Sequence, residues 1–200
     1  MYKLRKEILT EICDRNFSDL IKIAGELQKV VAEKLIIAAN QVVNTFESGG
    51  KLLICGNGGS AADSQHLATE FVSSFSKDLN RKSLPAISLS SDVAILTAYS
   101  NDFNFAGVFE RQVEALGSNI DTLIVFSTSG NSENCLKALE KAKLIGMRSI
   151  AFTGAPGYIG KISDFVIEVP STNTQHIQEC HQICYHTLVE LVENIMFRNK

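Results

Sequence analysis

The hydrophobic residues of this chain follow two different spacings, which divide the sequence near residue 50. Residues 1–49 carry apolar side chains three and four positions apart, a spacing that predicts amphipathic helix. Gly49 and Gly50 end this pattern, as glycine commonly does at the end of a helix. Beyond them, short apolar runs alternate with helical segments, and the runs are KLLIC (51–55), PAISLS (85–90), TLIVFS (122–127), RSIAFTG (148–154) and DFVIEV (164–169).

Continuous apolar runs of this kind are typical of strands buried in a parallel sheet. The segments near 60–76, 92–117 and 132–146 have helical spacing, and a long amphipathic helix is predicted from about 174 to 198. Strands that alternate with helices predict a doubly wound α/β sandwich. We find no linker in the sequence and expect one domain over 1–200. The apolar faces of the helical segments at both chain ends indicate packing against another subunit.

The composition is ordinary for a globular domain and argues against two classes of partner. Hydrophobic residues make up 45% of the 200 residues, and the formal net charge of −3 disfavours binding to nucleic acid or to a membrane surface. The sequence has neither the apolar core of a signal peptide nor an apolar run that could cross a bilayer. The five cysteines, an odd number, are expected to stay reduced. We therefore expect a cytoplasmic protein.

Two loops at predicted strand ends are rich in glycine and hydroxyl groups. GNGGS (56–60) follows the first apolar run, and STSGNS (127–132) follows the third. In an open parallel sheet, ligands bind beyond these strand ends, and the start of a helix attracts anions. Neither loop has the spacing of a dinucleotide fingerprint or of a P-loop, so we expect a small phosphorylated ligand. Helix caps and plain turns would also explain either loop alone.

Candidate acid–base chemistry lies in the helix after the first loop and in the last helix. His66 and Glu70 are four residues apart and share one helix face. A carboxylate can act as a general base there, and an imidazole can bind a metal or move a proton. In the last helix, Gln178 and His186 lie near one face, whereas His181 points about 140° away from His186.

These four side chains could converge on one divalent metal such as zinc, and the set is His66, Glu70, Gln178 and His186. Spacing alone also allows packing or solvent-exposed roles for each of them. Asn101 and Asp102, in SNDFNF (100–105), could bind sugar hydroxyls or cap the next helix.

Four segments together resemble the sugar isomerase (SIS) domain family and, within it, the phosphoheptose isomerases. They are CGNGGSAADSQHLATE (55–70), SND (100–102) with FERQVEALG (109–117), STSGNS (127–132) and IQECHQICYH (177–186). The resemblance covers nearly the whole chain. It implies a three-layer α/β/α sandwich with a five-stranded parallel sheet, and a homotetramer with active sites at subunit interfaces. It also implies conversion of sedoheptulose 7-phosphate to an aldoheptose 7-phosphate for surface-polysaccharide synthesis.

The resemblance assigns roles to individual residues of this sequence. Glu70 is similar to the family's base and His186 to its acid, and one zinc ion per active site would be held by His66, Glu70, Gln178 and His186. Contacts to the substrate and its phosphate would come from Asn57, Gly58, Gly59, Ser60, Asn101, Asp102, Ser127, Thr128, Ser129, Ser132 and Gln178.

The sequence departs from the family pattern at two positions. Ser74 and His176 stand where the family usually has arginines, and Lys77, Arg81 or Lys82 could compensate for the first. These departures bear on which sugar is bound. Two other interpretations stay open: a non-catalytic protein of the same scaffold that binds a phosphosugar or the replication initiator, and an isomerase of another phosphosugar. The retained base and acid favour an enzyme.

Overall fold

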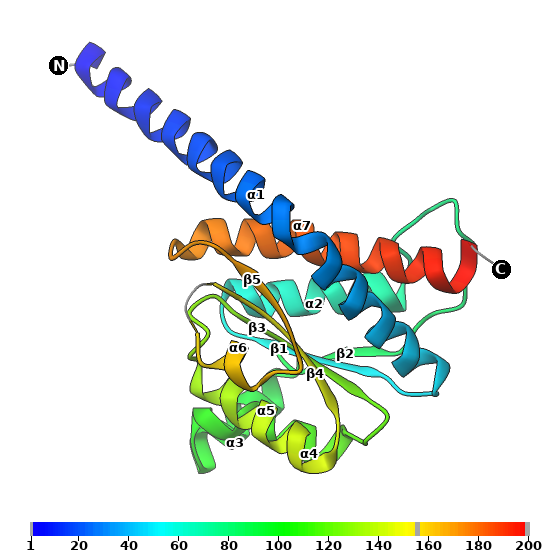
Figure 1. Ribbon diagram of the computed structural model, residues 1–200. Coiled ribbons are helices and arrows are strands. Elements are labelled where there is room, and N and C mark those ends of the chain that lie inside the picture. Colours follow the sequence, from blue (N-terminus) through cyan, green and yellow to red (C-terminus); the bar gives the residue numbers. More distant parts are fainter. Residues whose placement is uncertain (1, 155–156, 199–200) are drawn as a thin grey trace.

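The computed structural model describes residues 2–154 and 157–198 and has a five-stranded parallel sheet at its centre (Figure 1). The spatial order is β2-β1-β3-β4-β5, and each neighbouring pair is parallel. The order therefore reverses between β1 and β3. The strands are β1 (Leu52–Gly56), β2 (Ala86–Ser88), β3 (Thr122–Ser127), β4 (Arg148–Gly154) and β5 (Phe165–Val169).

Helices cover both faces of the sheet and complete the three layers predicted from the sequence (Figure 1). One layer holds α1 (Tyr2–Glu47), α2 (Gly59–Val72) and α7 (Thr174–Glu193). The other holds α3 (Val93–Asp102), α4 (Val108–Leu116), α5 (Glu133–Ile145) and the short α6 (Ile159–Ile162). A 3-10 turn spans Phe105–Gly107, and a π-helical turn, Asn194–Arg198, continues α7.

The continuous apolar runs arise because each strand packs on both of its faces. In β1, Leu52 and Ile54 belong to the core under α1, α2 and α7. Leu53 and Cys55 alternate with them and belong to the core under α4 and α5. Side chains of a strand point alternately to opposite faces, so every position of such a strand must be apolar.

The prediction of one helical segment over 92–117 is wrong at its centre, because residues 103–107 separate two helices there. The side chain of Asn104 accepts a hydrogen bond from the Gly107 N–H at 3.0 Å and starts a new turn. Gly107 also lies so close to the Tyr99 ring that a Cβ atom would collide with it. The helical spacing of apolar residues continues through this break and conceals it.

The first half of α1 projects away from the rest of the chain (Figure 1). Phe17 and Ile21 on this part are 72% and 71% exposed, whereas Leu35 and Val42 further along are buried in the core. Among the described helices, none combines the length and apolar composition needed to cross a bilayer.

Candidate active site

The loops after β1 and β3 meet where the strand order reverses and border an open pocket of about 330 Å³. This is the position at which open parallel sheets bind ligands. The structure thus brings together the two loops that the sequence singled out. The residues that line the pocket are Asn57, Gly58, Gly59, Ser60, Phe126, Ser127, Thr128, Ser132, Thr174 and Gln178.

Glycine is required in the first loop by its backbone and by a close neighbour. Gly58 has a φ of +56° and occupies the N-cap position of α2. No side-chain hydrogen bond caps this helix start within the described residues, so its first N–H groups remain suited to an anion. A Cβ atom on Gly59 would collide with the side-chain amide of Gln178, which reaches across from α7. The loop and α7 therefore form one wall of the pocket.

In the second loop, residues 127–132, two serine hydroxyl groups form a hydrogen bond with each other. The Ser127 and Ser132 hydroxyl oxygens are 3.0 Å apart, and both side chains line the pocket. Ser129 is exposed, lies outside the pocket lining, and accepts a hydrogen bond from the Asn131 N–H at 3.2 Å. Gly130 has a φ of +64° and packs against the backbone of Gly157.

A pair of amides that the sequence analysis missed joins the two loops. Asn57 donates from Nδ2 to Oδ1 of Asn134 at 2.9 Å, and Asn134 donates back to Asn57 at 2.8 Å. Asn134 is buried in the first turn of α5. The two helix starts are thereby fixed relative to each other. No spacing rule in the sequence points to this contact, because its partners are 77 positions apart.

His66, Glu70 and His186 form a compact cluster between α2 and α7. The Nε2 atom of His66 lies 3.0 Å from Oε1 of Glu70 and 3.5 Å from Nε2 of His186. One ligand atom from each of the three residues lies within 4.8 Å of the others. The His66 and Glu70 side chains are 40% and 18% exposed, so solvent and small molecules can reach the cluster.

Tyr185 contacts the cluster on the far ring nitrogen of His66, and the sequence analysis also missed this residue. Its hydroxyl lies 2.8 Å from Nδ1 of His66 and can donate or accept there, so it suits either tautomer of the imidazole. Burial raises the pKa of Tyr185, which keeps the hydroxyl protonated. A fixed contact on Nδ1 directs Nε2 toward Glu70 and His186.

The pKa values of two further side chains, His186 and Asp63, are shifted by their surroundings. Burial lowers the pKa of His186, and the nearby charge of His66 lowers it further, so His186 is neutral at pH 7. Burial raises the pKa of Asp63 to about 6, which the charge of His66 partly opposes. Asp63 precedes His66 by three residues on α2, and this helical spacing could have identified it.

The cluster contains donors that zinc commonly binds, and two of its ligand-atom distances are close to those of a zinc site. Imidazole and carboxylate are ordinary zinc ligands, and tetrahedral ligands about 2.0–2.1 Å from the metal lie about 3.3 Å from one another. The distances of 3.0 Å and 3.5 Å from His66 to its two neighbours bracket that value. Gln178 lines the pocket beside the two loops, about two turns before His186 on the same helix.

Other candidate residues lie apart from the pocket. His181 is fully buried against Phe126 and Phe152. This confirms the expectation that His181 and His186 do not belong to the same site. Asn101 and Asp102 are exposed at the end of α3, and the Asn101 amide donates to Asp102.

Ser74 and His176, the two departures from the family pattern, are both outside the pocket lining. Ser74 is exposed and donates to the Ser76 carbonyl. His176 is buried, with its Nδ1 atom 2.8 Å from Glu179 Oε2.

The parallel sheet, its two glycine-containing loops and the anion-suited helix start agree with a SIS-domain protein, and residues 17–154 match the SIS domain family. The phosphoheptose isomerase of Roseiflexus sp. is 50% identical over 169 residues, which cover 83% of this chain and 84% of that protein. The Aquifex aeolicus phosphoheptose isomerase is 46% identical over 181 residues, with 90% and 94% covered. The chain belongs to the phosphoheptose isomerase family, a family of isomerase enzymes.

A solved structure agrees with this family. The phosphoheptose isomerase from Neisseria gonorrhoeae superimposes with a TM-score of 0.88 at 36% sequence identity, and the match covers 93% of this chain and 99% of that one. The fold expected from the sequence is therefore confirmed.

Proposed function

We propose that this protein is the aldose–ketose isomerase that converts sedoheptulose 7-phosphate to D-glycero-D-manno-heptose 7-phosphate, for surface-polysaccharide heptose. The arrangement of α2 supports this most directly. Its start lines the pocket between the two loops, and further along it presents His66 and Glu70 to His186. The helix rise places His66 about 10 Å from Gly59. That separation is similar to the reach of an extended seven-carbon sugar between its phosphate and its carbonyl.

The proposed reaction needs one proton moved between carbons and one between oxygens. Glu70 takes the proton from C1 of the ketose and returns it to C2, with an enediol between the two transfers. His186, neutral at pH 7, takes the proton of the O1 hydroxyl and supplies one to O2, so it ends the reaction in the state in which it began. The hydroxyls of Ser127, Thr128 and Ser132 and the start of α2 hold the phosphate, so that the reacting carbons meet Glu70.

We further propose that His66, Glu70 and His186 hold one zinc ion, with Gln178 as the fourth ligand. When bound, zinc polarises the carbonyl and stabilises the developing oxyanion. The ligand-atom distances and the Tyr185 contact behind His66 support this assignment. The reaction is assigned to the cytoplasm, where the five free thiols of the chain stay reduced.

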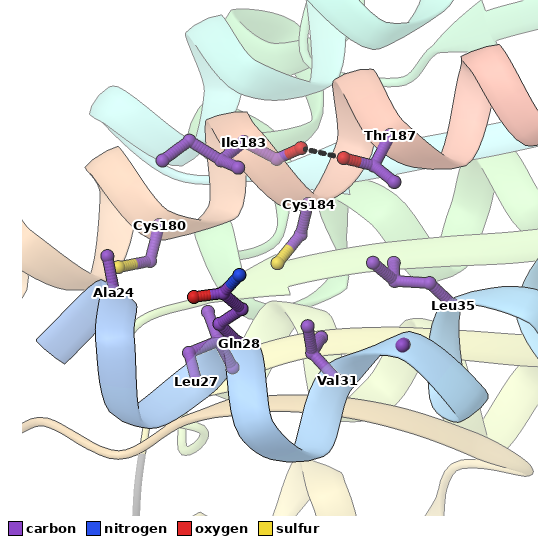
Figure 2. A pocket seen from close by; sticks show the side chains of 10 residues that line it. Ala24, Leu27, Gln28, Val31, Leu35, Cys180, Ile183, Cys184 and Thr187 are labelled. Atoms are coloured by element: carbon purple, nitrogen blue, oxygen red, sulfur yellow. Dashed lines mark hydrogen bonds between the residues drawn. The ribbon is translucent and has the colours of Figure 1, made fainter.

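A homotetramer with active sites at subunit interfaces is part of the proposal. The projecting half of α1 exposes large apolar side chains. Figure 2 shows an apolar groove of about 240 Å³ where α1 runs beside α7, lined among others by Leu27, Val31 and Cys184. Within α3, all of which is described, no residue is buried, and Val93 is 69% exposed. Burial of these surfaces by other copies would bring Asn101 and Asp102 to a substrate site. Sedimentation analysis is expected to give four chains.

The test is incubation of the pure protein with sedoheptulose 7-phosphate in deuterated water, with and without zinc. NMR and mass spectrometry should show an aldoheptose 7-phosphate, with deuterium at C2 where the proton held by the partly exposed Glu70 exchanges with solvent between the two transfers. The Glu70→Gln variant should keep its circular-dichroism spectrum and make no product. Product from the folded variant would remove Glu70 as the base, and the absence of product from the wild type would overturn the assigned substrate. Pentose and hexose phosphates run in parallel would then test the alternative raised by Ser74 and His176.

A further inference from the structure

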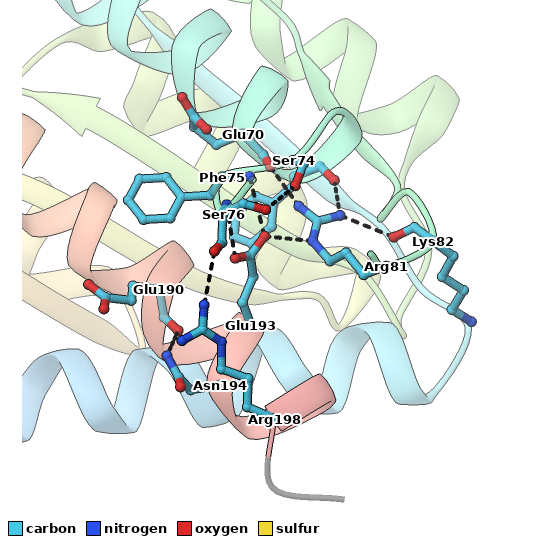
Figure 3. A network of polar contacts seen from close by, with 11 residues as sticks. Glu70, Ser74, Phe75, Ser76, Arg81, Lys82, Glu190, Glu193, Asn194 and Arg198 are labelled. Atoms are coloured by element: carbon cyan, nitrogen blue, oxygen red, sulfur yellow. Dashed lines mark hydrogen bonds and ion pairs between the residues drawn. The ribbon is translucent and has the colours of Figure 1, made fainter. Parts of the chain in front are cut away.

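A buried ion pair connects the two helices that carry the His66–Glu70–His186 cluster. Arg81, in the segment after α2, donates from Nε to Oε1 of Glu193 over 2.6 Å. The two side chains are 0% and 2% exposed. Figure 3 shows them at the centre of a network that reaches Glu70 on one side and the end of α7 on the other.

The Arg81 guanidinium also binds the end of α2. Nη2 donates to the backbone oxygen of Glu70 at 2.7 Å, and Nη1 donates to that of Phe71 at 2.9 Å. The last four carbonyl groups of a helix have no partner within the helix, and a positive charge is favourable there. Arg81 thus holds the backbone of the residue whose carboxylate contacts His66.

Glu193 holds the adjoining loop against α7. Its Oε1 and Oε2 atoms accept hydrogen bonds from the Phe75 and Ser76 N–H groups, each at 3.3 Å. Glu193 follows His186 by seven residues, or about two helical turns, and therefore shares its face of α7. The same carboxylate consequently fixes the end of α2 against the face that presents His186.

We propose that Arg81 and Glu193 are positioning residues, which set the separation of Glu70 and His186 and so prepare the metal site. This inference rests on the proposed function, because it concerns the spacing of the proposed zinc ligands. Arg81 does not replace the arginine expected at Ser74 as a substrate contact, since its donors are directed to Glu193 and to backbone oxygens.

Arg81→Lys tests the role of the guanidinium. Lysine keeps the charge, but one ammonium group cannot meet a carboxylate and two carbonyls in the fixed geometry of arginine. The matched control is Arg148→Lys, which alters an exposed ion pair with Asp164 between the starts of β4 and β5. Titration with zinc chloride, followed by calorimetry, should show zinc affinity about 10-fold lower in Arg81→Lys and unchanged in the control. The value of kcat should fall similarly, while KM stays at the wild-type value because the phosphate pocket is intact.

A double variant keeps the test decisive if Arg81→Lys folds poorly. Replacing both Arg81 and Glu193 with methionine leaves no unpaired buried charge, and such replacements often preserve stability. The folded double variant should show the same losses in zinc affinity and kcat. Wild-type zinc affinity and kcat in either variant that folds would show that the pair only closes the core, and would overturn the inference. Failure of the proposed function would appear separately, as a wild-type protein that neither binds zinc nor isomerises the sugar, and the inference would fall with it.

Discussion

Replacing His181 with leucine should make the stability of the fold much less sensitive to acid. The His181 ring is fully buried, with the ring centroids of Phe126 and Phe152 each 5.8 Å away. Neither ring nitrogen has a partner in hydrogen-bond geometry among the described residues. Burial lowers the pKa of His181 from 6.5 to about 4, and the nearby backbone of Thr153 opposes this shift only in part.

The sign and size of the effect follow from these two pKa values. Between pH 6.5 and about pH 4, the unfolded chain binds a proton at His181 that the folded protein does not. Folding stability is therefore lost as the pH falls through this window. The full window corresponds to about 3 kcal/mol of unfolding free energy, of which about 2 kcal/mol is lost by pH 5.

The assay is urea unfolding of the wild type and of His181→Leu at pH 7.5 and pH 5. Ionic strength and protein concentration are held constant, because association would otherwise change the apparent stability. The wild type should lose about 2 kcal/mol more than the variant between the two pH values. Asp63 and His186 titrate in both proteins, so their effects cancel in this comparison. Equal losses in the two proteins would refute the assignment of the acid sensitivity to His181.

Two further substitutions test the contacts around the site. Tyr185→Phe removes the hydroxyl that contacts Nδ1 of His66 and keeps the buried ring, so zinc affinity measured by titration should fall about 10-fold, and an unchanged affinity would exclude a role for the hydroxyl. Gly59→Ala forces a Cβ atom against the amide of Gln178 and should raise KM for the phosphosugar about 10-fold. Gly160→Ala, where a new Cβ meets no atom nearer than 3.4 Å, is its control, and equal KM values in the two variants would contradict the proposed wall of the pocket.

The sequence was sufficient to predict the sheet, because a strand buried on both faces requires a continuous run of apolar residues that can be recognised locally. Every position from Leu52 to Cys55 must be apolar when alternate side chains enter two different cores, and the same rule applies to β3. The meeting of the loops after β1 and β3 was predictable for a related reason. Glycine at 58 meets a local backbone requirement, and the carboxyl ends of neighbouring parallel strands lie at one edge.

Contacts that depend on the packing of one helix against another could not be predicted, because they produce no pattern in the local sequence. Tyr185 meets His66 only because α7 lies against α2, and the pairing of Asn57 with Asn134 depends on how two helix starts face each other. The break at 103–107 was hidden because apolar residues keep their helical spacing on both sides of it.

The first and last long helices of the chain lie against each other, and this contact has a consequence for synthesis on the ribosome. The buried stripe of α1, which includes Leu27 and Leu35, packs beside Cys184 and Leu188 of α7. The stripe stays uncovered until α7 has been translated, which follows all five strands of the sheet. The growing chain thus carries exposed apolar surface while the sheet is being synthesised, a state that invites aggregation and chaperone binding. The helix that covers it also carries His186, so closure of the core and completion of the His66–Glu70–His186 cluster both depend on the synthesis of α7.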